Sequence, residues 1–157
     1  MNSYMNVRLR EATHHDIPAM SEIASQGSNE SKFVGTFSLA NCVDYLTTFV
    51  EWEDATVMLA VDDDIVLGGV ILVKSREVWE QPLCYLVKFW ISKAGRRTPA
   101  SRRLMRFIDA WAERNKCLAV YATATGELSD REQRLFENMM KKSGYSDVGP
   151  TLKKRIT

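Results

Sequence analysis

The feature that most constrains the fold is a nearly all-apolar stretch, Leu83–Ile91, which leads through a basic loop into a strongly amphipathic pattern. Its sequence, LCYLVKFWI, is typical of a strand covered on both faces, so we expect it near the centre of a sheet. The apolar residues that follow share the spacing of one helical stripe: Leu104, Phe107, Ile108, Trp111 and Ala112. A buried strand followed by a half-buried helix predicts a layered domain with both kinds of element.

Two further helices are predicted in the first third of the chain, after a short alternating strand at residues 7–10. Thr13, with Asp16 three residues later, is a helix start signal, and apolar residues at helical spacing follow it. A polar stretch, residues 27–37, begins with Gly27 and is expected to end this helix and to form a loop. The second helical pattern spans residues 38–52.

A hairpin is predicted next, because two apolar segments, residues 55–61 and 65–73, flank the acidic turn of residues 62–64. The second of these strands contains Gly68-Gly69, which indicates a bulge or a close approach of another backbone. The apolar strand and the amphipathic helix described above follow this hairpin in the sequence.

The last part of the chain is expected to add three strands and one helix. Residues 117–122 (CLAVYA) are read as another buried strand. The last helix starts at Ser129 and runs to Gly144, which is well placed as its stop. Two short closing strands are expected at residues 145–148 and 152–156. The predicted order is therefore β-α-α-β-β-β-α-β-α-β-β, in a single domain.

Composition excludes several classes of protein. The 157 residues, 45% of them hydrophobic, suit one globular domain, and a net charge of +1 does not favour a broad nucleic-acid footprint. Three cysteines without close spacing (Cys42, Cys84 and Cys117) and the single pair His14-His15 indicate neither a disulfide framework nor a metal centre. No apolar run approaches the roughly 18 residues that cross a bilayer, so we expect a reduced cytoplasmic protein without a membrane partner.

The basic loop before the third helix is the candidate binding site. Thr98 suits the cap position and Pro99 the first helical position. Four arginines surround this helix start: Arg96, Arg97, Arg102 and Arg103. Because a helix N-terminus carries partial positive charge, cations there are unfavourable unless an anion binds between them. The sequence therefore predicts a phosphate or pyrophosphate site, with solvated arginines as the alternative.

The chain resembles the GNAT family, the Gcn5-related N-acetyltransferases that use acetyl-CoA. The element order matches that fold along almost the whole chain. The opening from Arg8 to Asp16 resembles the first strand and helix start of the family, and Ile91 to Trp111 resembles its acetyl-CoA segment. Residues 139–145 (MMKKSGY) resemble its closing helix and Gly-aromatic turn. Several features are also similar to short divergent members carried by bacteriophages.

The resemblance implies an α/β (α+β) fold, in which about four helices flank a mixed, mostly antiparallel, twisted sheet. In the family's Arg/Gln-x-x-Gly-x-Gly/Ala loop, Arg96 takes the first place, Pro99 the first glycine place and Ser101 the last. Amides around this loop would hold the coenzyme A pyrophosphate, and two residues of the central strand would bind the pantetheine arm through their main chains. The implied cofactor-binding residues are Phe89, Ile91, Arg96, Arg97, Thr98, Ala100, Ser101 and Arg102.

This sequence lacks two catalytic residues that many members of the family have. Met140 stands where many members have a proton-donating tyrosine, and Leu83–Ile91 contains no glutamate that could act as a base. The candidates that this sequence offers instead are Tyr121 as a proton donor and Glu127 as a base, with Tyr85 and Ser129 as further donors.

The expected function is acetyl transfer from the cosubstrate acetyl-CoA to a primary amine of a small molecule or a protein. The amine is expected to enter between the loop at residues 27–37, the connection at residues 76–82 and the loop at residues 123–129. The alternative is a domain of this fold that has lost catalysis and serves as a binding or structural protein, for example in a phage particle or against a host protein. A homodimer is compatible with either function, and a phage-encoded chain would act in the host cytoplasm.

Overall fold

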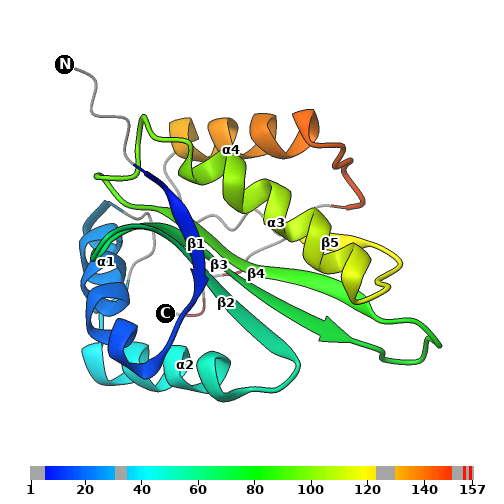
Figure 1. Ribbon diagram of the computed structural model, residues 1–157, viewed down its shortest axis with the longest axis horizontal. Coiled ribbons are helices and arrows are strands. Elements are labelled where there is room, and N and C mark those ends of the chain that lie inside the picture. Colours follow the sequence, from blue (N-terminus) through cyan, green and yellow to red (C-terminus); the bar gives the residue numbers. More distant parts are fainter. Residues whose placement is uncertain (1–5, 31–34, 123–129, 150–153, 155, 157) are drawn as a thin grey trace.

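The computed structural model of the chain describes residues 6–30, 35–122 and 130–149, together with Lys154 and Ile156. Figure 1 shows its elements, which are, in chain order, β1 (Arg8–Glu11), the short 3-10 turn η1 (His14–Asp16), α1 (Ile17–Glu30), α2 (Leu39–Glu51), β2 (Ala55–Asp62), β3 (Ile65–Ser75), β4 (Leu83–Ile91), α3 (Ala100–Arg114), β5 (Val120–Ala122) and α4 (Asp130–Lys142).

The strands form one sheet, in which their order in space is their order in the sequence, β1-β2-β3-β4-β5. The first four strands pair antiparallel with their neighbours, whereas β5 runs parallel to β4. Figure 1 shows α1 and α2 on one face of this sheet and α3 and α4 on the other. The mixed, mostly antiparallel sheet flanked by four helices is the predicted fold, and it is confirmed.

The central strand is β3 rather than β4, which corrects the expectation for Leu83–Ile91. Residues 66–73 of β3 are all buried, whereas the second half of β4 is only partly covered. The apolar composition of β4 still has the predicted cause, because the strand lies inside the sheet and contacts both cores. Cys84 and Leu86 belong to the core below α3 and α4, whereas Val87 and Trp90 pack against the core below α1 and α2.

The predicted stripe of α3 forms the centre of the larger core. Leu104 and Ile108 are fully buried, and they belong to the same cluster as Val70 and Leu72 of β3. At the end of the stripe, the Trp111 indole donates a hydrogen bond of 3.1 Å to the Thr56 hydroxyl, which satisfies the polar atom of a buried ring. Burial of this stripe therefore fixes the direction in which the preceding loop enters the helix.

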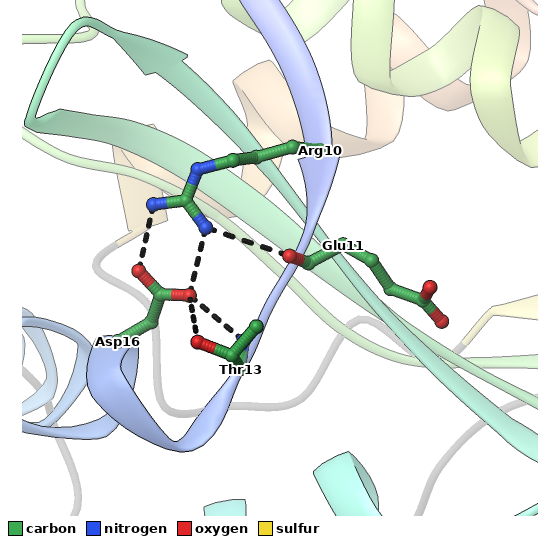
Figure 2. Close-up of polar contacts among 4 residues, drawn as sticks. All are labelled: Arg10, Glu11, Thr13 and Asp16. Atoms are coloured by element: carbon green, nitrogen blue, oxygen red, sulfur yellow. Dashed lines mark hydrogen bonds and ion pairs between the residues drawn. The ribbon is translucent and has the colours of Figure 1, made fainter.

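The predicted start signal of the first helix forms the network in Figure 2. The Asp16 carboxylate accepts a hydrogen bond from the Thr13 backbone N–H at 2.8 Å, which is one half of a capping box. The same carboxylate accepts two hydrogen bonds from the Arg10 guanidinium, at 2.7 and 2.8 Å. This pairing lowers the pKa of Asp16 and connects β1 to the helical segment that follows.

The break predicted from Gly27 to Ser31 begins later than expected, because α1 continues through Gly27 to Glu30. A glycine inside a helix costs about 1 kcal/mol relative to alanine, and the neighbouring helical residues can outweigh that cost. The predicted second helix is confirmed: the Ser38 hydroxyl accepts a hydrogen bond of 3.2 Å from the Asn41 N–H, and Trp52 follows the last residue of α2.

The hairpin and its glycines are also confirmed. Residues 63–64 connect β2 to β3, and the register between these strands shifts at Ala60/Val61, where Ala60 faces Gly68. A Cβ atom on Gly68 would lie 2.6 Å from the Trp90 carbonyl oxygen, and one on Gly69 would lie 2.4 Å from the Trp90 ring. Only glycine lets β3 approach β4 this closely at this point.

The end of the chain differs from its prediction in two respects. The strand expected at residues 117–122 is only Val120–Ala122, and its side chains are partly or largely exposed. Residues 145–148 form no strand, since the chain turns through Gly144 at a φ of +95° and pairs with no strand of the described sheet. The other closing strand falls mostly outside the described residues, and neither Lys154 nor Ile156 is in a strand.

Candidate functional site

The site begins where β4 and β5 stop pairing. Their paired residues run from Cys84–Val120 to Leu86–Ala122, and β4 continues for five residues beyond, to Ile91. At the same point the pairing between β4 and β3 contains a bulge. Leu72 faces Leu86, but the preceding residue of β3, Ile71, faces Lys88. The bulge leaves Val87 without a facing residue on β3 and reverses the direction in which the following backbone groups point.

The backbone groups of Phe89 and Ile91 therefore face away from β3. The Ser92 N–H points toward β3, since it donates a hydrogen bond of 2.9 Å to the Leu67 carbonyl. Successive N–H groups of a strand point in opposite directions, so those of Ile91 and Phe89 point away from β3. Within the part of the chain that the structure describes, no strand pairs with this edge of β4. An unpaired edge of this kind can bind an extended ligand as an added strand.

A tight turn attaches the basic loop to β3. The Ser92 hydroxyl lies 3.1 Å from the carbonyl oxygens of both Val66 and Leu67, and it accepts a hydrogen bond from the Gly95 N–H. A Cβ atom on Gly95 would lie 1.9 Å from the Leu67 oxygen, so no other residue fits without a backbone shift. Neither Ser92 nor Gly95 was predicted to have a role, although a serine three residues before a glycine is a turn signal.

The amides at the start of α3 fall into two groups. The Thr98 N–H donates to the Gly95 carbonyl, and the Ala100 N–H donates to the Thr98 hydroxyl, each at 3.2 Å. These bonds correct the expectation that the amides of Thr98 and Ala100 are available to a ligand. The amides of Arg97, Ser101 and Arg102 have no acceptor among the described residues.

Pro99 fits the place that the resemblance assigns to glycine, because its φ is −75°, within the range that the proline ring allows. It precedes α3 as the cap residue, one position earlier than predicted, and its carbonyl accepts the Arg103 N–H at 3.0 Å. The left-handed residue of the loop is Arg97, with a φ of +69°. A non-glycine residue in this conformation is uncommon, and such residues occur often at binding sites.

The four predicted arginines do not act alike. The Arg103 side chain donates a hydrogen bond to the Val7 carbonyl, so it holds the strand before α1 rather than a ligand. Arg96, Arg97 and Arg102 are exposed around the helix start, and the first turn of α3 contains no acidic residue. In the described ranges, neither Arg97 nor Arg102 forms an ion pair with a carboxylate. The site therefore combines positive charge with unpaired amides, a combination that favours an anion.

Among the candidate catalytic groups, the structure describes Tyr121 but not Glu127 or Ser129, which lie outside the described residues. Tyr121 is 41% exposed on β5, directly before the last paired residue. Its ring stacks on the Tyr85 ring with 5.8 Å between centroids. The Tyr85 hydroxyl donates a hydrogen bond to the Glu77 carboxylate, and this bond raises the pKa of Tyr85.

Other candidates are excluded by burial. Met140 is 5% exposed within the core between the sheet, α3 and α4, so it is a packing residue. Burial raises the pKa of the Cys84 thiol to about 12, which excludes a thiolate nucleophile there at neutral pH.

The described residues contain no group of three metal-ligating side chains, and no described helix has the length and apolar character to cross a bilayer.

A mixed sheet, a β4 edge that no described strand pairs with and a cationic loop before a long helix together suit an acyltransferase that uses coenzyme A. The family model described as "Acetyltransferase (GNAT) family" matches residues 27–140, which is most of the chain. The chain therefore belongs to the GNAT acetyltransferase family. No curated protein sequence matches it.

Solved structures similar to this fold include aminoglycoside acetyltransferases. The enzyme AAC(6')-Iy, solved with a bisubstrate analogue that contains CoA, is 10% identical with a TM-score of 0.72 over 97% of this chain and 99% of that one. AAC(6')-IG from Acinetobacter haemolyticus is 15% identical, with a TM-score of 0.70 over 96% and 99%. A transcriptional regulator from Bacillus halodurans C-125 has a TM-score of 0.76 at 13% identity, over 96% and 100%.

Acetyl-CoA is the cosubstrate of this family, and the described residues fit it in two respects. The edge of β4 at Phe89 and Ile91 has the form that an extended pantetheine arm requires. The amides of Arg97, Ser101 and Arg102 can donate to the oxygens of a diphosphate, and the nearby guanidinium groups match its charge.

Proposed function

We propose that this protein transfers the acetyl group of acetyl-CoA to a primary amine of a small molecule or a protein. The observation that supports the proposal is the junction between β4 and α3. There, within the described ranges, no strand pairs with the edge of β4, three amides have no acceptor and two arginines have no carboxylate partner. Each of these features is unfavourable for a merely structural loop, and together they match an extended ligand with a charged diphosphate.

In this proposal the main chains of Phe89 and Ile91 bind the pantetheine arm. Arg97 and Ser101 donate their amide protons to the diphosphate, and the guanidinium groups of Arg96, Arg97 and Arg102 neutralise its charge. The role of the site is mainly positioning, because holding an amine beside a carbonyl carbon supplies about 7 kcal/mol or more of the barrier.

Acetyl-CoA supplies a thioester whose carbonyl carbon forms a bond to the amine nitrogen while its bond to sulfur breaks. The amine must lose a proton, and we assign Glu127 to accept it, directly or through water. The departing sulfur must gain a proton, and we assign Tyr121 to donate it. The Tyr121 hydroxyl suits this role because it has no hydrogen-bond partner within the described residues.

Calorimetric titration with acetyl-CoA and with CoA tests the cosubstrate site. We expect the unaltered protein to bind with micromolar affinity, and the double variant Arg97→Ala/Arg102→Ala to bind about tenfold more weakly or worse, since two charge-assisted contacts are lost. Arg106→Ala is the matched control, because Arg106 is an exposed arginine further along the same helix. Heat of titration equal to dilution in the unaltered protein would refute the proposal.

A second candidate function is a GNAT domain without catalysis that acts as a binding or structural protein, for instance in a phage particle or in the cytoplasm of a phage host. Two observations favour it: Met140 is buried in the core without a hydroxyl, and β4 contains no carboxylate. Thiol release in the presence of acetyl-CoA and a panel of amines and peptides separates the two functions. Binding of acetyl-CoA without turnover on any amine supports the second.

A further inference from the structure

A pair of tyrosines lies on the face of the sheet opposite to α3 and α4. On β4, Cys84 and Leu86 point into the core below α3 and α4, so Tyr85 between them points to the other face. On β5, Val120 and Ala122 pack against that same core, so Tyr121 also points to the other face. The two residues are direct neighbours across the parallel pairing, and their rings stack at an interplanar angle of 26°.

A carboxylate completes this group. Glu77 lies in the connection between β3 and β4, in a left-handed conformation with a φ of +48°, and it accepts a hydrogen bond from the Tyr85 hydroxyl. In the part of the chain that the structure describes, no lysine or arginine forms an ion pair with Glu77. The adjacent Arg76 instead lines a separate hollow with Trp52 and Asp54.

The tyrosine–glutamate group, defined as Glu77, Tyr85 and Tyr121, has the chemistry of a cation site. Aromatic faces attract a positive charge placed within about 6 Å of the ring, and a nearby unpaired carboxylate strengthens this attraction. Tyr121 is 41% exposed, so an aromatic face is accessible from solvent. An anionic ligand would be repelled by the carboxylate, and a neutral ligand would lack the attraction between opposite charges.

The position of the group connects it to the transfer reaction. Tyr85 and Tyr121 immediately precede Leu86 and Ala122, the last of the described residues at which β4 and β5 pair. An acceptor bound on this face therefore lies beside the point where the unpaired edge of β4 begins, on the side of the sheet away from α3.

We propose that Glu77, Tyr85 and Tyr121 bind a positively charged group in the body of the acceptor, so that the acceptor is an amine with a second cationic group. That the bound cation is the acceptor rests on the proposed acetyl transfer. The substrate class is then a diamine or polyamine, or a sugar with several amino groups, rather than a neutral monoamine.

The first test measures binding without acetyl-CoA. Choline and its neutral carbon isostere dimethylbutanol are titrated into the protein, and protein chemical shifts are followed by NMR. We expect choline to bind about fivefold more tightly than the isostere, and Glu77→Gln and Tyr85→Leu to abolish this preference. Tyr85→Trp, which keeps an aromatic face, should retain it, and Tyr45→Leu, which removes an exposed tyrosine on α2, is the control. Equal binding of the two probes to the unaltered protein overturns the proposal.

The second test uses turnover. With acetyl-CoA saturating, Glu77→Gln should raise the KM for putrescine about fivefold, leave kcat nearly unchanged and leave the KM for butylamine unaffected. If both amines are acetylated equally well by the unaltered protein, the inference fails and the transferase stands. If choline is preferred but acetyl-CoA does not bind, the transferase fails and Glu77, Tyr85 and Tyr121 form a cation site of another function.

Discussion

At the residue scale, Asp16 is the most highly connected polar side chain in the described part of the molecule. Its carboxylate accepts hydrogen bonds from the Arg10 side chain and the Thr13 backbone, and the Asp16 side chain is only 10% exposed. One side chain thereby determines both where η1 begins and how β1 is oriented toward it (Figure 2).

We expect Asp16→Asn to lower the free energy of unfolding by about 1 to 2 kcal/mol at neutral pH, because the ion pair with the half-exposed Arg10 is lost. The pKa of Asp16 is lowered in the folded protein, so its contribution is present above the unfolded pKa and is lost as the pH falls through the folded pKa. Urea unfolding between neutral pH and pH ~3 measures this. A difference between the two proteins that stays constant with pH would contradict the assignment.

At the scale of elements, the turn between β4 and α3 depends on the absence of a side chain at Gly95. We expect Gly95→Ala to destabilise the protein by about 1 to 3 kcal/mol, because the new Cβ atom must displace the turn from the Leu67 carbonyl. The same displacement moves the amides of Arg97 and Ser101, so acetyl-CoA should also bind more weakly. Thermal unfolding and calorimetry measure the two effects.

Gly27→Ala is the matched control for this substitution. Gly27 lies inside α1, and a Cβ atom there would meet nothing within 4 Å. We therefore expect it to stabilise the protein by about 0.5 to 1 kcal/mol, as alanine does in a helix. Equal effects of the two substitutions would show that the contact between Gly95 and Leu67 is not formed in solution.

At the scale of the whole molecule, the two cores meet at β3, which is buried from residue 66 to residue 73. Central strands open only with the whole domain, so we expect the amides of Val70 and Leu72 to exchange with solvent most slowly. The short, exposed β5 should exchange much faster. Hydrogen exchange followed by NMR tests this order, and faster exchange in β3 than in β5 would contradict the arrangement of the cores.

Binding of acetyl-CoA at the junction of β4 and α3 should also raise the melting temperature, since the ligand binds only the folded state. At a hundredfold excess over the Kd the gain is about 2.7 kcal/mol, or roughly 5 to 10 °C in a domain of this size. The Arg97→Ala/Arg102→Ala variant should require more ligand for the same shift. A melting temperature independent of acetyl-CoA in the unaltered protein would contradict the site.

Local patterns in the sequence determined most of the elements. Three signals appear where they were predicted, because each depends on neighbours within a few residues: the stripe from Leu104 to Ala112, the cap at Ser38 and the pair of Thr13 with Asp16. The same locality explains the error at Gly27, since the cost of one glycine is smaller than the gain from the helix around it. Locality is also the reason that the sequence alone indicates the cationic loop before α3.

Only the tertiary structure decided which parts of that loop are available. Arg103 is held by Val7, 96 residues earlier, and no local pattern distinguishes it from Arg102. Among the described residues, β5 pairs with β4 only up to Ala122, which leaves the following edge of β4 without a partner strand there, and Tyr85 meets Tyr121 only through that pairing. The charge of the loop before α3 follows from the sequence, because it depends only on which residues the loop contains. Which of its amides and arginines a ligand can reach, and whether Glu77, Tyr85 and Tyr121 come together, depends on contacts between residues far apart in the chain. Such contacts are set by how the elements pack.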